Sequence, residues 1–362
     1  KYVLRDPVTQ QYAANIRGGS NNYSYTFSAA YDKTLGELQN KAQKLNIRSE
    51  SIFRPAKNLQ ISFGTYYTHN KSISGHTAFN SITIGGRPVP YYRLADEEGN
   101  PLPIDITYRS SYTDTAGGGK LLDWKYYPLE EAKRSRQTIT RQELFAYAGI
   151  QYRVFPFLNI DLKYQYQEQQ SVADRINDPE SYVARSSINS FSQLNRNTGV
   201  IKYIVPLGGT RVLANSKIAS NTIRGQMNLN KTLGDHAVIA ILGGEIREAK
   251  SNSDEHTIYG YTTDPMKTSQ VDFVNTYPDF ISGSYAYIGG YPSFRQTLNR
   301  FVSFFGNASY TFNRKYSVSA SGRRDGANIF GVNTNEKWKP LWSVGAGWKI
   351  SEEPFYNFPV LP

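Results

Sequence analysis

The dominant pattern in this chain is a strict alternation of apolar and polar residues. In residues 23–31, aromatic or apolar side chains occupy the odd positions, and small or hydroxyl side chains occupy the even ones. Successive side chains of a β-strand point to opposite faces, so this segment predicts a strand with one apolar and one polar face. The alternation recurs in ten further segments: 12–17, 45–53, 59–67, 144–154, 158–166, 223–229, 236–247, 299–312, 316–323 and 341–350. The chain is therefore predicted to form about eleven strands.

The connections between these strands alternate in length. The short ones are residues 18–22, 54–58, 155–157, 231–235 and 313–315, and the long ones are 32–42, 70–137, 169–220, 248–298 and 324–340. In an up-and-down meander every second connection lies at the same end of the sheet. All turns are therefore predicted at one end and all long loops at the other, which is typical of outer-membrane β-barrels.

Alternation alone fits two classes of protein. A soluble sandwich buries its apolar face, whereas a membrane barrel turns that face to lipid and the polar face to a wet lumen. Many of the predicted strands reach the ~9–11 residues that cross a bilayer, and soluble strands average nearer ~5–6. Aromatic residues near strand ends suit interfacial girdles: Tyr31, Tyr66, Tyr67, Tyr152, Phe312 and Tyr316. The pattern favours an all-β, transmembrane antiparallel barrel, with a soluble or surface glycan-binding β-protein as the alternative.

Composition narrows the classes further. The 362 residues have a net charge of +11, a mean hydropathy of −0.54 and no cysteine. No apolar run approaches the ~20 residues of a membrane-spanning helix, so a helical membrane protein is excluded. The lack of cysteine excludes a disulfide scaffold, a thiol enzyme and a Cys-ligated metal site. The charge is spread along the chain, and we expect Lys and Arg to contact a wet lumen and anionic outer-membrane lipid or lipopolysaccharide, not nucleic acid.

The C-terminal part carries a specific motif. Residues 305–326 read FGNASYTFNRKYSVSASGRRDG, and residues 343–353 read SVGAGWKISEE. In order and spacing this resembles a barrel segment of the SusC/RagA family of TonB-dependent outer-membrane transporters. There, a strand pair ends in Arg-Arg-Asp-Gly and the next strand ends in Gly-Trp-(Arg/Lys)-Ile-Ser-Glu-Glu. The opening also looks like the family at Gly18-Gly19, Tyr23, Ser28 and Tyr31, while the middle matches only in strand rhythm.

The resemblance implies a location and a function. Residues 1–362 would form a partial receptor barrel domain in the bacterial outer membrane, about eleven strands of a 22-stranded barrel. The family's plug domain and TonB-binding segment are not recognisable here, and we expect them in sequence outside these residues. The implied activity is active import of a large nutrient, an oligosaccharide or a peptide. The implied partners are a SusD-like surface lipoprotein and the TonB–ExbB–ExbD system, which would act through the plug.

Three groups of residues are candidates for this function. Loop aromatics could stack on sugar rings or peptide side chains, although packing within the loops is an equally good interpretation: Trp124, Tyr126, Tyr127, Tyr285, Tyr287 and Tyr291. Alternate polar positions of one strand are expected to line the lumen: Asn159, Asp161, Gln165 and Gln167. Arg323, Arg324 and Asp325 are expected to anchor a loop to the barrel, since Asp-Gly favours a turn.

Catalytic and cofactor chemistry finds little support in the sequence. His69 and His76 lie near Ser72 and Ser74, which leaves a barrel hydrolase as an alternative. No nucleophile motif surrounds them, so we expect no enzyme and no catalytic residue. Residues 117–120 lack the spacing of a phosphate loop. We expect no cofactor, with calcium bound by the acidic residues 96–100 as the remaining option.

Overall fold

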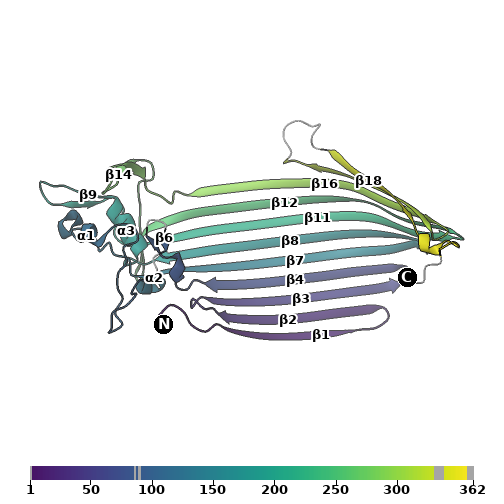
Figure 1. The fold of residues 1–362 in the computed structure, drawn as a ribbon, viewed down its shortest axis with the longest axis horizontal. Coiled ribbons are helices and arrows are strands. Elements are labelled where there is room, and N and C mark those ends of the chain that lie inside the picture. Colours follow the sequence, from purple (N-terminus) through teal and green to yellow (C-terminus); the bar gives the residue numbers. More distant parts are fainter. Residues whose placement is uncertain (1, 85–86, 89–90, 330–337, 357–362) are drawn as a thin grey trace.

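The computed structural model describes residues 2–84, 87–88, 91–329 and 338–356, and one antiparallel sheet dominates it (Figure 1). Its main strands are β1 (Val8–Gly19), β2 (Tyr23–Leu35), β3 (Lys41–Ala56), β4 (Leu59–Ile73), β7 (Ser135–Phe155), β8 (Leu158–Asn177), β11 (Gly209–Leu233), β12 (His236–Thr263), β16 (Ser293–Phe312), β17 (Tyr316–Ala327) and β18 (Lys339–Trp348). Each pairs with the next in chain order, so the sheet is an up-and-down meander. The predicted antiparallel architecture is confirmed.

The remaining elements belong to the connections. They are β5 (Thr83–Ile84), β6 (Arg87–Pro88), β9 (Ser192–Leu194), β10 (Ile201–Tyr203), β13 (Met266–Ser269), β14 (Thr276–Pro278), β15 (Tyr285–Tyr287), α1 (Ser110–Thr113), α2 (Pro128–Arg134), α3 (Tyr182–Ser190) and the 3₁₀ turns Phe79–Ser81, Ala116–Gly119 and Ile350–Glu352. Figure 1 shows the three helices gathered at one end of the sheet. None of the described helices is long and apolar enough to span a membrane.

The two ends of the sheet differ as the connection lengths predict. The tight turns at 20–22, 57–58, 156–157, 234–235 and 313–315 join strands at the end opposite the helices (Figure 1). Gly234, Asn313 and Arg314 adopt φ values of 55°, 50° and 57° there. Left-handed residues of this kind let a chain reverse within two or three residues. The connections 36–40, 178–208 and 264–292 and the described part of 74–134 lie at the other end.

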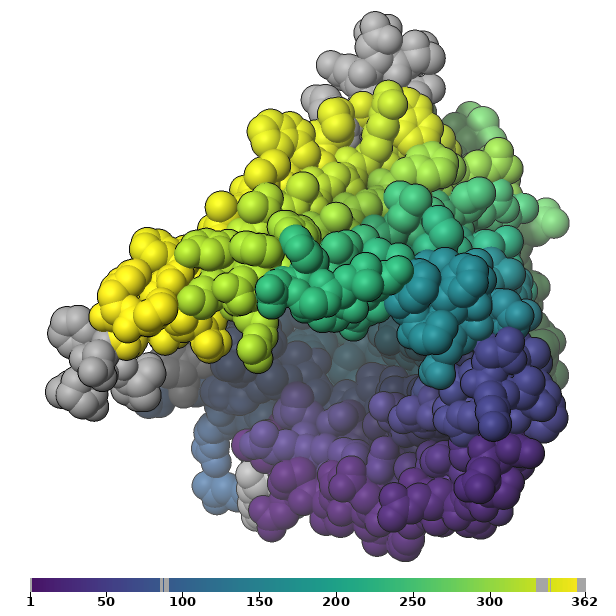
Figure 2. All heavy atoms as spheres, turned by 90° about the vertical axis from the view of Figure 1, so that its right-hand side faces the viewer, coloured from purple at the N-terminus to yellow at the C-terminus, as the bar shows by residue number. Residues whose placement is uncertain are grey.

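The sheet curves around a hollow (Figure 2). Many large apolar residues of its strands are exposed and share the face that we call convex. Tyr152, Ile160, Met227 and Leu242 follow one another in register across β7, β8, β11 and β12. Such residues are exposed, with Leu162 at 50%, whereas Asp161 and Gln165 on the concave face of the same strand are half-buried. A soluble protein shows the reverse distribution. Among the described residues the sheet is not closed, because β1 and β18 pair on one side only.

The strands extend beyond the predicted segments at the loop end. β12 has 28 residues, from His236 to Thr263, where alternation predicted residues 236–247. Beyond Ile246 the convex positions become polar, beginning with Glu248 and Lys250, while the backbone pairing with β11 and β16 continues. The hydrophobic pattern therefore marks only the apolar band of each strand, not its length.

One predicted girdle residue lies on the wrong face. Tyr66 pairs with Arg48 and Phe145 on the concave side, and its hydroxyl donates to the carboxylate of Glu50. The neighbouring Tyr67 lies on the convex side, as expected. The expectation for Tyr66 was wrong because adjacent strand residues point to opposite faces, so only one of two consecutive tyrosines can face outward.

The hydrophobic core of the molecule lies in its loops, not under its sheet. One cluster consists of Ile188, Val205, Tyr259 and Ile288, and a second of Val3, Ala95 and Leu129. The first joins α3 to the end of β12 and to the connection that follows it. The described residues of the connections 74–134, 178–208 and 264–292 therefore pack as one unit, which we call the loop assembly.

Candidate functional site

Helix α3 forms the centre of the loop assembly. Ser181 is its N-cap, and the Ser181 hydroxyl accepts a hydrogen bond of 3.2 Å from the backbone N–H of Ala184. This cap satisfies a helix N–H that would otherwise lack a partner. The buried side of α3 includes Ala184 and Ile188, and Ile188 belongs to the first core cluster.

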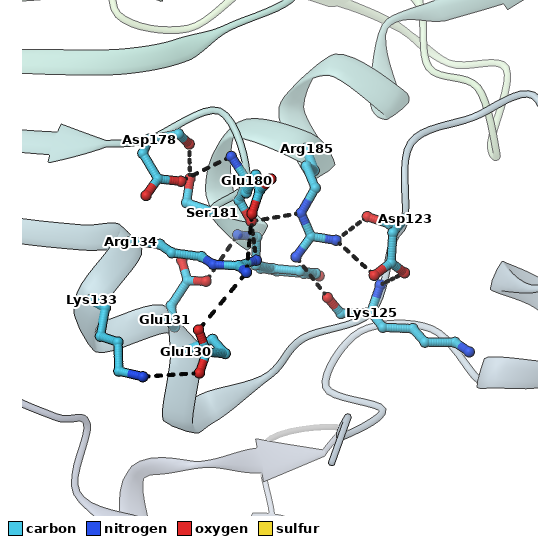
Figure 3. A network of polar contacts seen from close by, with 11 residues as sticks. Asp123, Lys125, Glu130, Glu131, Lys133, Arg134, Asp178, Glu180, Ser181 and Arg185 are labelled. Carbon is cyan, nitrogen blue, oxygen red and sulfur yellow. Dashed lines mark hydrogen bonds and ion pairs between the residues drawn. The ribbon is translucent and has the colours of Figure 1, made fainter. Parts of the chain in front are cut away.

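A polar network attaches α3 to the longest connection (Figure 3). The Arg185 side chain, on a residue only 7% exposed, donates to the carbonyl oxygens of Glu180 (2.9 Å), Lys125 (3.1 Å) and Asp123. The Asp123 carboxylate lies 3.4 Å from the same guanidinium. Arg134, at the end of α2, adds a 3.1 Å hydrogen bond to the Glu180 carbonyl. Two loops separated by about fifty residues in the sequence are thereby linked through cationic side chains.

Glu131 is a partly buried acid within this network. One of its carboxylate oxygens accepts a 2.9 Å hydrogen bond from the backbone N–H of Tyr182, at the start of α3. The other, Oε1, is buried and has no hydrogen-bond partner among the described residues. Burial raises the pKa of Glu131 above its ordinary value, because desolvation disfavours the charged form.

Trp124 proves to be part of the loop core. It is 4% exposed, its indole N–H donates to Ser186 at 3.2 Å, and its ring lies 5.4 Å from that of Tyr108 and 6.3 Å from that of Phe280. The expectation of an exposed aromatic is corrected here. Trp124 packs within the loops, because its ring has neighbours from three loop segments.

Tyr126 and Tyr127 are half-buried beside the polar network. The Tyr126 ring meets the Tyr182 ring edge-on at 5.4 Å, and burial raises the pKa of both Tyr126 and Tyr127. By contrast, Tyr285, Tyr287 and Tyr291 are 72%, 64% and 68% exposed. Tyr285 and Tyr287 lie on strand β15, which pairs with β14 in a two-stranded hairpin. These three residues are the predicted aromatics that remain open to a ligand, and their contact with one stays a prediction.

The loop assembly also contains a cavity that sequence reasoning missed. It has a volume of about 880 Å³ and lies between residues 112–120, 192–199 and 278–281. Tyr112 and Phe280 supply aromatic surface, and Lys120 and Arg196 supply positive charge. Gly117 and Gly118, with φ values of 66° and 60°, form the turn that lets one wall pass close to Leu121. The segments lie far apart in the sequence, and only the aromatic character of the loops hinted at the site.

The four lumen candidates lie together on the concave face of β8. Asp161 accepts a hydrogen bond from the amide of Asn228, and Gln167 donates to Glu143 at 2.9 Å. A second cavity of about 420 Å³ is lined by Asp161, Lys163, Gln165, Thr222, Arg224, Gln226 and Glu245. The register places Asn159 on the same face, opposite Asn228 and Arg153. The geometry suits a polar wall, and their contact with a transported ligand stays a prediction.

The Arg-Arg-Asp motif lies within a strand and not in a turn. Arg323 and Asp325 form a 2.8 Å ion pair on the concave face of β17, and Arg323 also donates to Ser303 at 3.3 Å. Arg324, on the other face, stacks over Trp338 with its guanidinium 5.5 Å from the ring centroid. Phe330 and Gly331, which follow this motif in the sequence, lie outside the described residues. Loop anchoring is therefore corrected for Arg323 and Asp325, whose contacts join neighbouring strands, because β17 continues to Ala327.

The residues weighed for catalysis or metal binding are not brought together. No hydrogen bond joins His69 or His76 to a serine hydroxyl or a carboxylate in the described part of the chain, and His76 Nδ1 is buried without a partner there. Burial lowers the pKa of His76. The Asp96 carboxylate accepts hydrogen bonds of 2.7 Å and 2.8 Å from Asn100. Across the described ranges, no group of three His, Asp or Glu residues is arranged to hold a metal ion.

Comparison with known proteins gives two kinds of match. No family model matches the chain. It is 26% identical over 135 residues to TonB-dependent receptor P26 of Formosa agariphila, a match that covers 37% of this chain and 12% of that protein. It is 30% identical over 129 residues to TonB-dependent receptor P39 of the same organism, covering 35% of this chain and 11% of that protein.

The structural matches extend over nearly the whole chain. The match to the RagAB peptide transporter covers 99% of this chain and 36% of the transporter chain, with a TM-score of 0.71 and 15% sequence identity. The "open-open" state of the RagAB peptide importer also gives a TM-score of 0.71, with 16% sequence identity. The outer-membrane transporter YddB of Escherichia coli gives 0.53 at 8% identity. The chain thus spans about a third of these transporter chains. It resembles TonB-dependent receptors in sequence and has the fold of an outer-membrane β-barrel transporter, which confirms the resemblance and the outer-membrane location predicted from its C-terminal motif.

Proposed function

We propose that the receptor built on this sheet imports a large nutrient across the outer membrane by TonB-dependent transport. The observation that carries the proposal is the distribution of side chains on the curved sheet. Apolar residues predominate on its convex face, polar residues predominate on the concave face of β8 and β11, and the loop assembly stands over one end. Such a wall suits a polar solute that passes through a lipid bilayer. The likeness to TonB-dependent receptors supports the energy source.

A peptide is the first candidate for the nutrient, and an oligosaccharide is the second. The neighbours with the same fold are described as a peptide transporter and importer, which supports the peptide. Exposed tyrosines offer flat apolar surface with a hydroxyl at the edge, which suits both peptide side chains and sugar rings. Tyr285 and Tyr287 project from the β14–β15 hairpin and would make the first contact with the nutrient.

The proposed partners follow from the same class. A SusD-like surface lipoprotein would pack against the loop assembly, and the TonB–ExbB–ExbD system would act through a plug domain. The likeness to the RagAB pair supports the lipoprotein. We propose no bond-making step and no bound cofactor for this chain, since import changes only the position of the nutrient.

Uptake in cells tests the proposal. Fluorescently labelled peptides and oligosaccharides would be offered to cells that express the receptor, with and without a functional TonB system. We expect uptake of one class to require both the receptor and TonB. Uptake that persists without TonB, or no uptake of either class, would contradict the proposal.

A double substitution tests the capture site separately. Tyr285→Ala with Tyr287→Ala removes two exposed rings, each worth ~0.5–1.5 kcal/mol in an aromatic contact, so we expect about tenfold weaker ligand binding. Tyr91→Ala is the matched control, because Tyr91 is a loop tyrosine that is 92% exposed and lies outside the hairpin. Equal affinity of the double variant and the control would show that the hairpin does not contact the ligand.

A further inference from the structure

The cavity of the loop assembly has the size and the charge of a ligand site. Its volume of about 880 Å³ lies within the range of pockets that hold small ligands, ~300–1,000 Å³. Three of its lining residues are charged, namely Lys120, Arg196 and Asp279, and the others are uncharged. The cavity is therefore suited to a small ligand, or to the end of a longer one, that carries a charge.

The walls of the cavity come from three connections that hydrogen bonds hold together. The fully buried Asn189 accepts a 3.0 Å hydrogen bond from the backbone N–H of Leu122 and donates a 2.9 Å hydrogen bond to the carbonyl oxygen of Leu122. The backbone N–H of Phe280 donates to the carbonyl oxygen of Ser190 at 2.8 Å. The walls are thus in place before a ligand arrives, which lowers the ordering cost of binding.

One tight turn brings the two cations of the cavity together. The backbone N–H of Gly199 donates a 2.7 Å hydrogen bond to the carbonyl oxygen of Asn195, and Arg196 lies within the turn that this bond closes. The Lys120 ammonium group donates to the carbonyl oxygen of Gly199 in the same turn. An ammonium group has three donors, so Lys120 keeps two of them for a ligand.

Neither cation has a carboxylate partner in the described part of the chain. The Arg196 side chain is exposed and forms no hydrogen bond or ion pair with the described residues. The Asp279 carboxylate is occupied within its own turn, where one oxygen accepts from the backbone N–H groups of Ile281 at 3.1 Å and Ser282 at 2.8 Å and from the Ser282 hydroxyl at 3.0 Å. The donors of Lys120 and Arg196 therefore remain for an anionic ligand.

The cavity adjoins the exposed tyrosines of the β14–β15 hairpin. Pro278 lines the cavity and pairs with Tyr285 across the hairpin. Tyr112, on α1, is 39% exposed and adds an aromatic ring to another wall. Figure 1 shows α1 and β9 on the side of the loop assembly that faces away from the sheet. A ligand held on the hairpin can therefore extend into the cavity from outside the barrel.

We propose that this cavity binds the nutrient through a carboxylate group, with Lys120 and Arg196 as donors and with Tyr112 and Phe280 as apolar contacts. Hydrogen bonds between charged partners are about twice as strong as those between neutral ones. A peptide has a carboxylate at its C-terminus or on acidic side chains, and an oligosaccharide has one on a uronic acid residue. The inference rests on the proposed import of a peptide or an oligosaccharide, and it specifies the acidic members of that class.

An acidic side chain of the lipoprotein partner is the other occupant that the charge would fit. The shape favours the nutrient, because the two cations lie in a recess between three connections and the volume of the recess is that of a small-ligand pocket. Binding of short ligands to the receptor without its partner distinguishes the two occupants.

Calorimetric titration of the detergent-solubilised, full-length receptor tests the inference with four probes. They are an otherwise uncharged pentapeptide that ends in phenylalanine with a free carboxylate, the C-terminal amide of the same peptide, a uronic acid tetrasaccharide and its methyl ester. We expect the carboxylate form of one pair to bind at least tenfold more tightly than its neutral form, because it accepts hydrogen bonds as a charged group. The pair that shows the difference identifies the source of the carboxylate.

Arg196→Gln removes a charge without removing a contact among the described residues. We expect it to weaken binding of the carboxylate probe about tenfold and to leave binding of the neutral probe unchanged. Arg196→Lys keeps the charge and should bind the carboxylate probe more tightly than Arg196→Gln. Lys202→Gln is the matched control, because Lys202 is exposed on the same hairpin, opposite Gln193, and does not line the cavity. The control should stay within twofold of the unaltered receptor.

Three results would overturn the inference: no binding of either carboxylate probe, equal binding of the charged and neutral forms in both pairs, or equal loss in Arg196→Gln and Lys202→Gln. Uptake by cells with and without TonB separates such a failure from a failure of the proposed function. TonB-dependent uptake that is equal for the charged and the neutral form would leave the proposed import standing and overturn only the carboxylate site.

Discussion

At the scale of single residues, a few buried charged groups hold the loop assembly together. Arg185 exchanges water for three carbonyl oxygens and one carboxylate, contributed by residues 123–125 and by Glu180. A guanidinium has five donors in a rigid planar arrangement, so one arginine can satisfy several acceptors that a lysine could not. Arg185 therefore makes more of the side-chain hydrogen bonds between these two long loops than Arg134, which donates one, to the Glu180 carbonyl.

Replacing Arg185 with alanine should loosen the loop assembly without unfolding the sheet. The carbonyls and Asp123 would lose a buried charged donor, so we expect a local destabilisation of about 2–4 kcal/mol. Limited proteolysis of residues 114–134 and 178–208 would report the change, and heat-modifiable mobility should stay unaltered. Lys133→Ala is the control, since Lys133 makes only a solvent-exposed contact with Glu130. Equal protease resistance in all three proteins would show that Arg185 is dispensable.

Glu131 gives the loop assembly a dependence on pH. Burial raises its folded pKa above the ordinary value of 4.5. The stabilising contribution of this group is therefore fully present below pH 4.5 and is lost as the pH rises through its folded pKa. Glu131→Gln keeps an oxygen for the Tyr182 N–H and carries no charge, so the variant should resist proteolysis better than the unaltered protein at pH 7. The difference should vanish at pH 4.

The lowered pKa of His76 acts in the opposite direction, since a buried neutral histidine stabilises the fold at high pH and loses that effect as the pH falls. Comparing the Glu131→Gln variant with the unaltered protein at each pH cancels this contribution. Glu130→Gln is the matched control, because it makes the same change on the neighbouring residue of α2, whose carboxylate is already paired with Lys133 at 3.1 Å and Arg134 at 3.8 Å. A pH profile of Glu131→Gln identical to that of the unaltered protein would contradict the assignment.

Residues on the sheet could be placed from the sequence, and residues in the loops could not. The parity of Asp161 and Gln165 within an alternating segment decides which face they occupy, once the segment is known to be a strand. No such rule predicts the position of Trp124, which lies in a loop. Its burial depends on Ser186 and Phe280, which are distant in the sequence and reach it only after the loop assembly has folded.

At the scale of elements, the apolar band of a strand is shorter than the strand itself. The order and number of the eleven main strands follow from alternation, but their lengths do not. On β8, alternation ends at Tyr166, where Glu168 takes the next convex position, and pairing continues to Asn177. Lipid sets the extent of the hydrophobic pattern, whereas backbone hydrogen bonds set the extent of the strand.

This distinction predicts how two substitutions on one strand should differ. Leu162 lies in the middle of the apolar band of β8 on the convex face, and Gln165 lies on the concave face. Leu162→Arg would place a charge in hydrocarbon, so we expect a destabilisation of about 2–4 kcal/mol. Gln165→Arg would face the polar wall and should change stability by less than about 1 kcal/mol. Denaturant unfolding in lipid vesicles measures both, and similar losses would show that the two faces are assigned wrongly.

At the scale of the whole molecule, the sheet has two edges that need a partner. β1 has twelve residues paired only with β2, and β18 has ten paired only with β17. In an antiparallel edge strand, alternate residues present unpaired N–H and C=O groups, and each such group costs several kcal/mol in hydrocarbon. The apolar surface alone would let the sheet enter a bilayer, but the edges oppose it.

We therefore expect the segment 1–362, expressed alone, not to form a stable monomeric barrel in lipid vesicles. Joined to the strands that complete its sheet, the same residues should fold, because every edge group then gains a hydrogen bond. Protease protection of the apolar band and heat-modifiable mobility would compare the two proteins under one refolding protocol. A protected, monomeric form of the isolated segment would contradict the expectation and would require β1 to pair with β18. Such pairing would close a barrel of eleven strands. The lumen of a barrel that small would be too narrow to pass a large nutrient.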